Sequence, residues 1–226
     1  MLHSLLSLLP DGPFAETLAT YVVRLPAALG VTLRVTFGAT LIAVVLGMLV
    51  AIGRASGNVW VSWSFAAATN IGRCIPLPPL QLLVYFMLLS ALPIDAATAG
   101  MLAIGLHFAP YMAELFRSGI AAIPRGQIEA AETLGFSVGL VRRRVVLPMA
   151  IRLTIPAVGQ LVVGILLNSA FVSQIGARDI TGMGRNIINA TFSTDLWLVI
   201  AFTYFVIAFP VSRLLDWLER RLAVGL

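Results

Sequence analysis

The run "VTFGATLIAVVLGMLVAIG", Val35–Gly53, contains no charged residue and is bounded by Arg34 and Arg54. A membrane-crossing helix needs roughly 20 apolar residues, because the hydrocarbon core is about 30 Å thick and a helix rises about 1.5 Å per residue. Charged side chains are costly at the bilayer centre, so charge-free windows mark the segments that can cross it. The run therefore predicts a transmembrane helix.

Four other windows share this property, and the composition agrees with them. The chain has 226 residues, of which 59% are hydrophobic and 11% charged, whereas soluble domains carry about a quarter charged residues. We therefore expect an all-α integral membrane protein with about five transmembrane helices. The uncharged stretch Ala55–Gly72 is rich in aromatic rings and interrupted by polar residues, which favours an interfacial helix over a sixth span. The four other windows are Cys74–Ile94, Ala96–Ala113, Leu153–Ala177 and Leu196–Ser212.

All fifteen basic residues are arginines, and their placement predicts an orientation. Five spans with the N-terminus outside put eleven of them in the cytoplasm, as the positive-inside rule requires. The C-terminus is then cytoplasmic. The apolar opening stretch lacks a basic leader and carries Asp11 and Glu16, so we do not expect a cleaved signal peptide. The four arginines left outside are Arg24, Arg34, Arg178 and Arg185.

Residue counts also exclude several functions. A single cysteine, Cys74, excludes an internal disulfide framework, and two histidines, His3 and His107, are too few for an ordinary metal cluster. Since the arginine excess follows from membrane topology, it does not predict nucleic-acid binding. The chain has no G-x4-G-K-[ST] motif, so we expect no ATPase site of its own.

The stretch "EAAETLGFSVGLVRRRVVLP", Glu129–Pro148, is unexpectedly charged for a membrane protein. Pro124 and Gly126 should end the preceding helix, and "QIEAAETL" should form a short helix with its glutamates near the start, where the helix dipole favours them. Gly135 is expected to stop this helix, and a second short helix should end at Pro148. The small side chains of Ala130 and Ala131 would let another protein approach the backbone closely. The stretch therefore predicts a docking loop, although its arginines alone would also suit an ordinary cytoplasmic loop.

The spacing of this loop resembles the EAA signature of ABC-transporter permeases, E-A-A-x3-G-x9-I-x-L-P. Valine in place of isoleucine is the only departure. The segments "PYMAELFRSGIAAIPRGQIEAAETLG" and "GRCIPLPPLQLLVYF" also look like the polar amino acid uptake family, and the resemblance runs from about Gly30 to Leu222. It implies the fold of an ABC type I importer permease and one transmembrane domain over residues 1–226, with a cytoplasmic coupling loop at about 118–152.

The resemblance also implies partners and residue roles. Two ABC ATPase subunits would bind the loop and ATP, so that this chain needs no cofactor. A second permease subunit would complete a homodimer or heterodimer in the bacterial inner membrane, and an extracytoplasmic solute-binding protein would deliver a polar amino acid or close derivative. The residues that the resemblance assigns to ATPase coupling are Glu129, Ala130, Ala131, Gly135, Leu147 and Pro148.

Polar side chains inside the predicted spans are candidates for structure or for substrate contact. Glu114 and Arg117 lie three residues apart, which favours an ion pair on one helical face. Many relatives read lysine-aspartate-threonine-serine where this chain has Leu167-Asn168-Ser169-Ala170, so the ionic groups of the family are absent here. Candidates for a substrate path are His107, Tyr111, Asn168, Ser169, Ser173 and Gln174.

Two other functions remain to be compared with a permease. A stand-alone channel or secondary carrier should show internal repeats and its own ion site, and the chain shows no repeat. An intramembrane enzyme would need a paired nucleophile and base or metal ligands at one depth, and His107, Glu114 and Cys74 have no matched spacing. The sequence therefore favours a permease subunit that depends on a separate ATPase.

Overall fold

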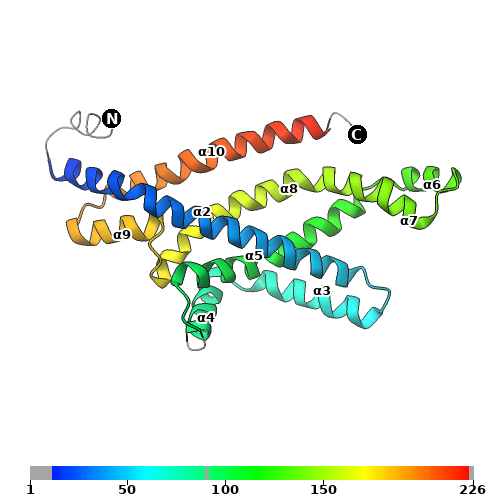
Figure 1. The fold of residues 1–226 in the computed structure, drawn as a ribbon, viewed down its shortest axis with the longest axis horizontal. Helices are drawn as coiled ribbons and strands as arrows, with labels where there is room; N and C mark the ends of the chain where they lie inside the picture. Colours follow the sequence, from blue (N-terminus) through cyan, green and yellow to red (C-terminus); the bar gives the residue numbers. More distant parts are fainter. Residues whose placement is uncertain (1–11, 90–91, 224–226) are drawn as a thin grey trace. The chain divides into compact units, whose positions relative to one another are not determined.

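The computed structural model describes residues 12–89 and 92–223, and the elements within these ranges are all helical (Figure 1). The expected N-terminus outside the membrane lies beyond the described residues. The elements are α2 (Pro13–Arg54), α3 (Val59–Cys74), α4 (Leu77–Leu89), α5 (Ala96–Ala121), α6 (Arg125–Thr133), α7 (Val138–Val141), the π-helical turn η1 (Arg142–Val146), α8 (Leu147–Asn168), the 3₁₀ helix η2 (Ser169–Ile175), α9 (Ile180–Thr191) and α10 (Leu196–Ala223).

The chain forms two compact units, each assembled from separate stretches of sequence. The first unit contains residues up to Ala39 together with Leu77–Ile104 and Ile165–Phe209. The second contains Thr40–Pro76, Gly105–Gly164 and the segment from Pro210. The prediction of a single transmembrane domain over residues 1–226 stays a prediction.

Four of the helices are long and apolar enough to cross a membrane: α2, α5, the continuous helical run that contains α8, and α10. Helix α4 lies inside the expected second span, Cys74–Ile94, but it is long and apolar enough to cross a membrane only together with α3, from which a break at Ile75 and Pro76 separates it. Ile75 is extended, with φ −86° and ψ 119°, as expected of a residue that precedes proline. If this broken pair counts as one span, the total is five, in agreement with the expected number.

Helix α2 begins 22 residues before the charge-free window that predicted it, at Pro13 instead of Val35. Two arginines lie within this N-terminal extension. The Arg34 guanidinium lies 3.1 Å from Oδ1 of Asp95 and donates to the hydroxyl of Thr98 at 2.5 Å. The carboxylate of Asp95 thus offsets the positive charge of Arg34, which had marked the expected start of the membrane-crossing helix.

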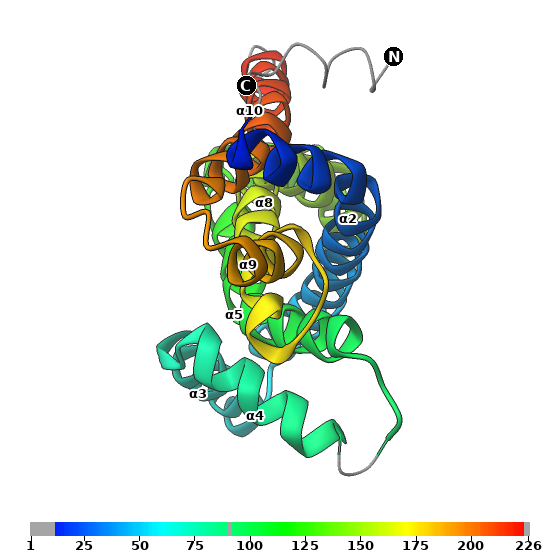
Figure 2. The same cartoon turned by 90° about the vertical axis from the view of Figure 1, so that its left-hand side faces the viewer.

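The first unit has an apolar core around α9 (Ile180–Thr191). The sequence did not predict this helix, which is labelled in Figure 2. Asp179 caps α9, because its carboxylate accepts hydrogen bonds from the backbone of Gly182 at 3.0 Å and of Thr181 at 3.2 Å. The core consists of Tyr21, Ala28, Ile180, Met183, Ile187, Ile188, Leu196, Ile200 and Tyr204.

Candidate functional site

The predicted docking loop is built from α6, α7 and η1 in the second unit, with α6 packed against the other two (Figure 1). Gly135 has φ +80°, in the left-handed region that glycine tolerates best. Its N–H donates to the carbonyl of Glu132 at 2.9 Å, and the N–H of Phe136 donates to the carbonyl of Ala131 at 3.2 Å. These two bonds form a Schellman motif, so α6 ends where the glycine predicts.

The exposed surface of α6 carries two acidic groups and, at the C-cap, one large apolar group. Glu129, Ala130 and Glu132 are exposed, and the side chain of the C-cap Leu134 is 76% exposed. Ala131 is buried, so the expectation that both alanines face a partner is wrong for this one. Ala131 lies on the face of α6 that packs within the loop, where Val141 of α7 is also buried.

The structure corrects two local predictions in this loop. Helix α6 begins at Arg125, two residues earlier than expected, so neither glutamate lies in its first turn. The second helix does not end at Pro148, because α7, η1 and α8 follow one another without a break. The N–H of Leu147 donates to the carbonyl of Arg142 in the wide π turn that directly precedes the proline. A wider turn accommodates a ring that would otherwise clash with the preceding helical turn.

Helices α5 and α8, which flank the loop, approach each other closely within the second unit. A Cβ atom on Gly119 would lie 2.1 Å from Cγ2 of Thr154 and 3.4 Å from the carbonyl oxygen of Ala150. Both Gly119 and Thr154 are buried. Helices α5 and α8 therefore pack closely against each other at this point.

Glu114 on α5 contacts two arginines, of which residue spacing predicts Arg117 alone. Its Oε1 lies 2.5 Å from the guanidinium of Arg117, and its Oε2 lies 2.7 Å from that of Arg54 on α2. The Arg54–Glu114 pair is mostly shielded from solvent, with side-chain exposures of 18% and 27%. Both oxygens of this carboxylate are thus occupied, and the cluster holds α2 to α5.

The predicted substrate-path residues fall into two groups. His107 and Tyr111 lie in the second unit, with ring centroids 5.5 Å apart. Asn168, Ser169, Ser173 and Gln174 lie in the first unit, where α8 changes to the 3₁₀ helix η2 at Ser169.

Within the second group, exposure differs sharply. The Ser169 hydroxyl is buried and donates to the carbonyl of Leu166 at 2.7 Å, and Ser173 is buried as well. Asn168 is half-buried, and Gln174 is exposed. The Ser169 hydroxyl therefore uses its hydrogen bond within its own helical segment. The four residues do not form one shared polar surface.

A pocket of about 370 Å³ in the second unit is lined by polar groups from separate parts of the sequence, together with apolar residues. Tyr111 is one of the predicted substrate-path residues, Arg73 is one of the eleven arginines expected on the cytoplasmic side, and the sequence pattern does not predict a role for Gln160. The uninterrupted apolar context of Gln160 was the one signal that could have found it. The lining residues are Arg73, Tyr111, Glu114, Leu115, Ala157, Gln160, Leu161 and Gly164. Across residues 12–89 and 92–223, no group of three or more His, Cys, Asp or Glu side chains could hold a metal ion.

Together, the apolar spans and the exposed loop between two of them define a helical membrane protein. The family described as binding-protein-dependent transport system inner membrane component matches residues 43–224, and the chain belongs to this family.

Relatives and a solved structure extend this likeness over most of the chain. The nopaline transport system permease protein NocM of Agrobacterium fabrum is 35% identical over 84% of both chains. The histidine/lysine/arginine/ornithine transport system permease protein HisQ of Escherichia coli is 30% identical over 86% of this chain and 91% of its own. A crystal structure of an amino acid ABC transporter with histidines gives a TM-score of 0.85 and 32% identity, covering 94% of this chain and 100% of that chain.

Proposed function

We propose that this chain is the permease subunit of an ATP-driven importer for a polar amino acid or close derivative. Family membership supports a role in binding-protein-dependent transport. The amino-acid class is supported by relatives and a solved structure that are named for amino acids and their derivatives, and that match the chain over more than four fifths of its length.

The exposed face of α6 supports the proposed contact with an ATPase subunit. Leu134 leaves a large apolar side chain uncovered on a charged loop, and Glu129 lies on the same short helix. Apolar surface that is exposed outside the bilayer gains stability when a partner covers it. The ATPase subunit would bind this face and would also bind the ATP.

We expect alternating access to depend on the way the loop is attached. Closure of the ATPase subunits on ATP would move α6, and the close packing of Gly119 on α5 against Thr154 on α8 would carry both helices with it. Rigid displacement of packed helices is a common route between two discrete states. A second permease subunit, identical or related, would supply the other half of the pathway, and a solute-binding protein would deliver the solute from outside.

The test is uptake by vesicles reconstituted with the chain and the ATPase, binding protein and any second permease encoded beside it. We expect accumulation of a labelled polar amino acid that requires ATP and the binding protein. Export, uptake without ATP, or transport of only a sugar or metal ion would contradict the proposal.

A further inference from the structure

The pocket in the second unit combines one arginine with an apolar wall. Arg73, Tyr111, Glu114 and Gln160 supply its polar groups, whereas Leu115, Ala157, Leu161 and Gly164 supply apolar surface. Its volume of about 370 Å³ lies at the small end of the range for ligand pockets. The pocket is therefore of a size for a small solute with one polar end.

The charge that a ligand would meet in this pocket is positive. Glu114 is its acidic lining residue, but Oε1 is bound by Arg117 and Oε2 by Arg54. A ligand cation could reach this carboxylate only by displacing one of these guanidinium groups. Arg73 and Glu114 are the charged residues that line the pocket, and the charge of Glu114 is offset by Arg54 and Arg117, which contact it without lining the pocket. The balance therefore favours a ligand anion.

Arg73 is positioned to bind that anion. It lies in the last turn of α3, and the Tyr111 hydroxyl on α5 donates to its backbone carbonyl at 3.1 Å. Its guanidinium donates to the amide oxygen of Asn70 at 3.0 Å and is exposed. A guanidinium carries five N–H donors in a planar fork that matches a carboxylate, so donors remain for a ligand.

We propose that this pocket binds the α-carboxylate of an amino acid through Arg73 and prefers neutral or acidic side chains to cationic ones. The hydroxyl of Tyr111 and the amide oxygen of Gln160 would accept hydrogen bonds from the α-ammonium group. The side chain would lie against Leu115, Ala157 and Leu161. This inference rests on the proposed function, since it assigns a site and a charge class to the transported amino acid.

A purely structural role for Arg73 is the competing explanation, because a cation in the last turn of a helix favours the helix dipole. The two roles predict different measurements. A structural arginine affects the stability of the protein regardless of ligand, whereas a carboxylate-binding arginine affects the Kd of ligands according to whether they carry a carboxylate.

The experiment is calorimetric titration of the complete permease–ATPase complex in lipid nanodiscs. The probes are L-glutamine, L-glutamate, L-histidine and L-arginine, together with the carboxamide analogue of the tightest binder. We expect a neutral or acidic amino acid to bind most tightly and its carboxamide to bind at least tenfold more weakly. Arg73→Gln should raise the Kd of the carboxylate ligand roughly ten- to hundredfold and leave that of the carboxamide unchanged.

Arg73→Lys should give an intermediate Kd, because lysine keeps the charge and loses the fork. It also provides the test if Arg73→Gln fails to assemble. Arg152→Gln, an exposed arginine of α8 that does not line the pocket, is the matched control and should bind as the wild type does.

Three results would overturn the inference: an unchanged Kd in Arg73→Gln, equal losses for carboxylate and carboxamide, or tightest binding of L-arginine. If vesicles take up amino acids normally while one of these results is found, the inference alone fails. If vesicles take up no amino acid, the proposed function fails with it.

Discussion

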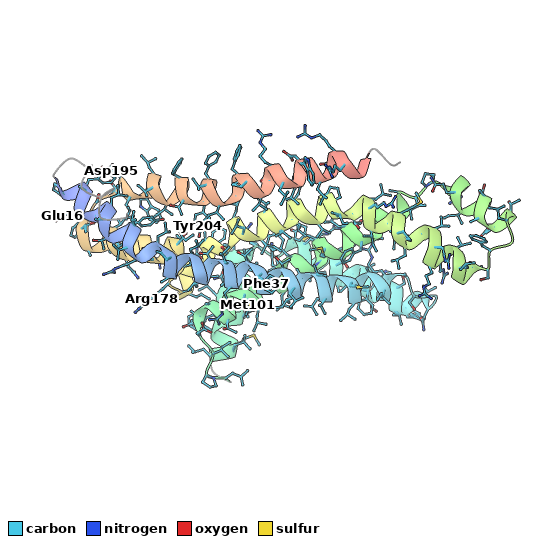
Figure 3. All side chains as sticks on the ribbon, turned by 45° about the horizontal axis from the view of Figure 1, so that its top comes forward. Glu16, Phe37, Met101, Arg178, Asp195 and Tyr204 are labelled. Carbon is cyan, nitrogen blue, oxygen red and sulfur yellow. The ribbon has the colours of Figure 1, made fainter. Side chains whose placement is uncertain are left out.

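The hydroxyl of Tyr204 donates to Oδ2 of Asp179 at 3.1 Å, and both residues are buried in the first unit (Figure 3 labels Tyr204). The same hydroxyl accepts a hydrogen bond from Thr181, also at 3.1 Å. The carboxylate therefore caps α9 and ties this helix to α10. A single acidic residue thus holds together two elements of the apolar core.

Replacing Asp179 with alanine should destabilise the protein by about 1–3 kcal/mol, since the change removes the cap of α9 and leaves the Tyr204 hydroxyl without its acceptor. Asp179→Asn keeps an acceptor oxygen and should cost less. Thermal unfolding in detergent measures both, with the exposed Asp195→Asn as the control. Equal melting temperatures for Asp179→Ala and Asp195→Asn would show that this bond contributes nothing to stability.

The same residue should make stability depend on pH. Burial raises the pKa of Asp179 from its ordinary 3.8 to about 6, because the charged form is poorly solvated there. A raised carboxyl pKa means that the folded state holds the proton more tightly than the unfolded state. The resulting stabilisation is fully present below about pH 4 and is lost as the pH rises to about 6.

Comparison of wild type with Asp179→Asn isolates this effect from other carboxyl groups. One of these, Asp95, has its pKa lowered, first by the hydrogen bond from Thr98 and then by Arg34, and acts in the opposite direction. The unfolding free energy of the wild type relative to the variant should fall between pH 4 and pH 6, by an amount on the order of 2–3 kcal/mol, and the difference in melting temperature should fall with it. A constant difference across this range would contradict the expectation.

Charge-free windows predicted the first residues of α5 and α10, Ala96 and Leu196, but not that of α2. The window before Arg54 missed 22 residues of α2, because it treated Arg34 as a boundary and could not foresee the partner at Asp95. Helix α9 is short and carries Arg185, so it does not contain a long charge-free apolar run that would predict it. The capping aspartate before it was the local signal that could have found it.

Local backbone chemistry was the more reliable guide in the docking loop. Gly135 was expected to end a helix, and it lies at φ +80°. The π turn before Pro148 and the burial of Ala131 depend on how α6 packs against its neighbours, which residue spacing does not specify. The pocket at Arg73 could not be predicted either, because it brings together residues from α3, α5 and α8.

Cysteine labelling should establish which side of the membrane the docking loop faces. In a Cys74→Ser background, Ser137→Cys should react with an impermeant reagent only from the cytoplasmic side, and Pro93→Cys only from the outside. Both positions are exposed, whereas Ala97 at the start of α5 is buried and would label poorly. Labelling of Pro93→Cys from the cytoplasm would reverse the proposed orientation.

The packing of Gly119 should be necessary for the loop to act on both flanking helices. Gly119→Val would force its side chain against Thr154 and the Ala150 carbonyl, so we expect α5 and α8 to separate. ATP hydrolysis in vesicles should then lose its stimulation by solute and binding protein, with the ATPase still bound. Gly119→Val with normal stimulation would show that the close approach has no part in coupling.

Charge reversal on the exposed face of α6 should weaken attachment of the ATPase. Glu129→Lys replaces an exposed negative group with a positive one without disturbing the backbone bonds that end the helix. We expect less ATPase to co-purify, and recovery to vary with salt because exposed charges are screened. Arg142→Ala should have a smaller effect, since the π turn uses the backbone carbonyl of that residue and not its side chain. Equal losses in the two variants would mean that the loop acts only through its overall charge.

Gly135→Val should damage coupling without preventing membrane insertion. The space around Gly135 is open, with no atom within 4 Å of an added Cβ, so the cost comes from its φ of +80°. A β-branched residue tolerates this conformation poorly, at a cost of roughly 1–2 kcal/mol. The hydrogen bonds donated by the backbone N–H groups of Gly135 and Phe136 should then weaken. Without them, the end of α6 should no longer hold Glu129 and Leu134 in fixed positions. Co-purification of the ATPase and solute-stimulated ATP hydrolysis should both fall.

Gly139 provides the matched control, because it is also exposed on this loop and has open space around it, but lies in the helical turn α7 without a positive φ. Gly139→Val adds the same side chain to the same loop at an ordinary backbone position, so it should couple nearly as well as the wild type. Loss of coupling in Gly135→Val alone assigns the effect to the end of α6. If Gly135→Val and Glu129→Lys both couple normally, α6 is not the surface through which the ATPase acts, and the loop only anchors the topology of the chain.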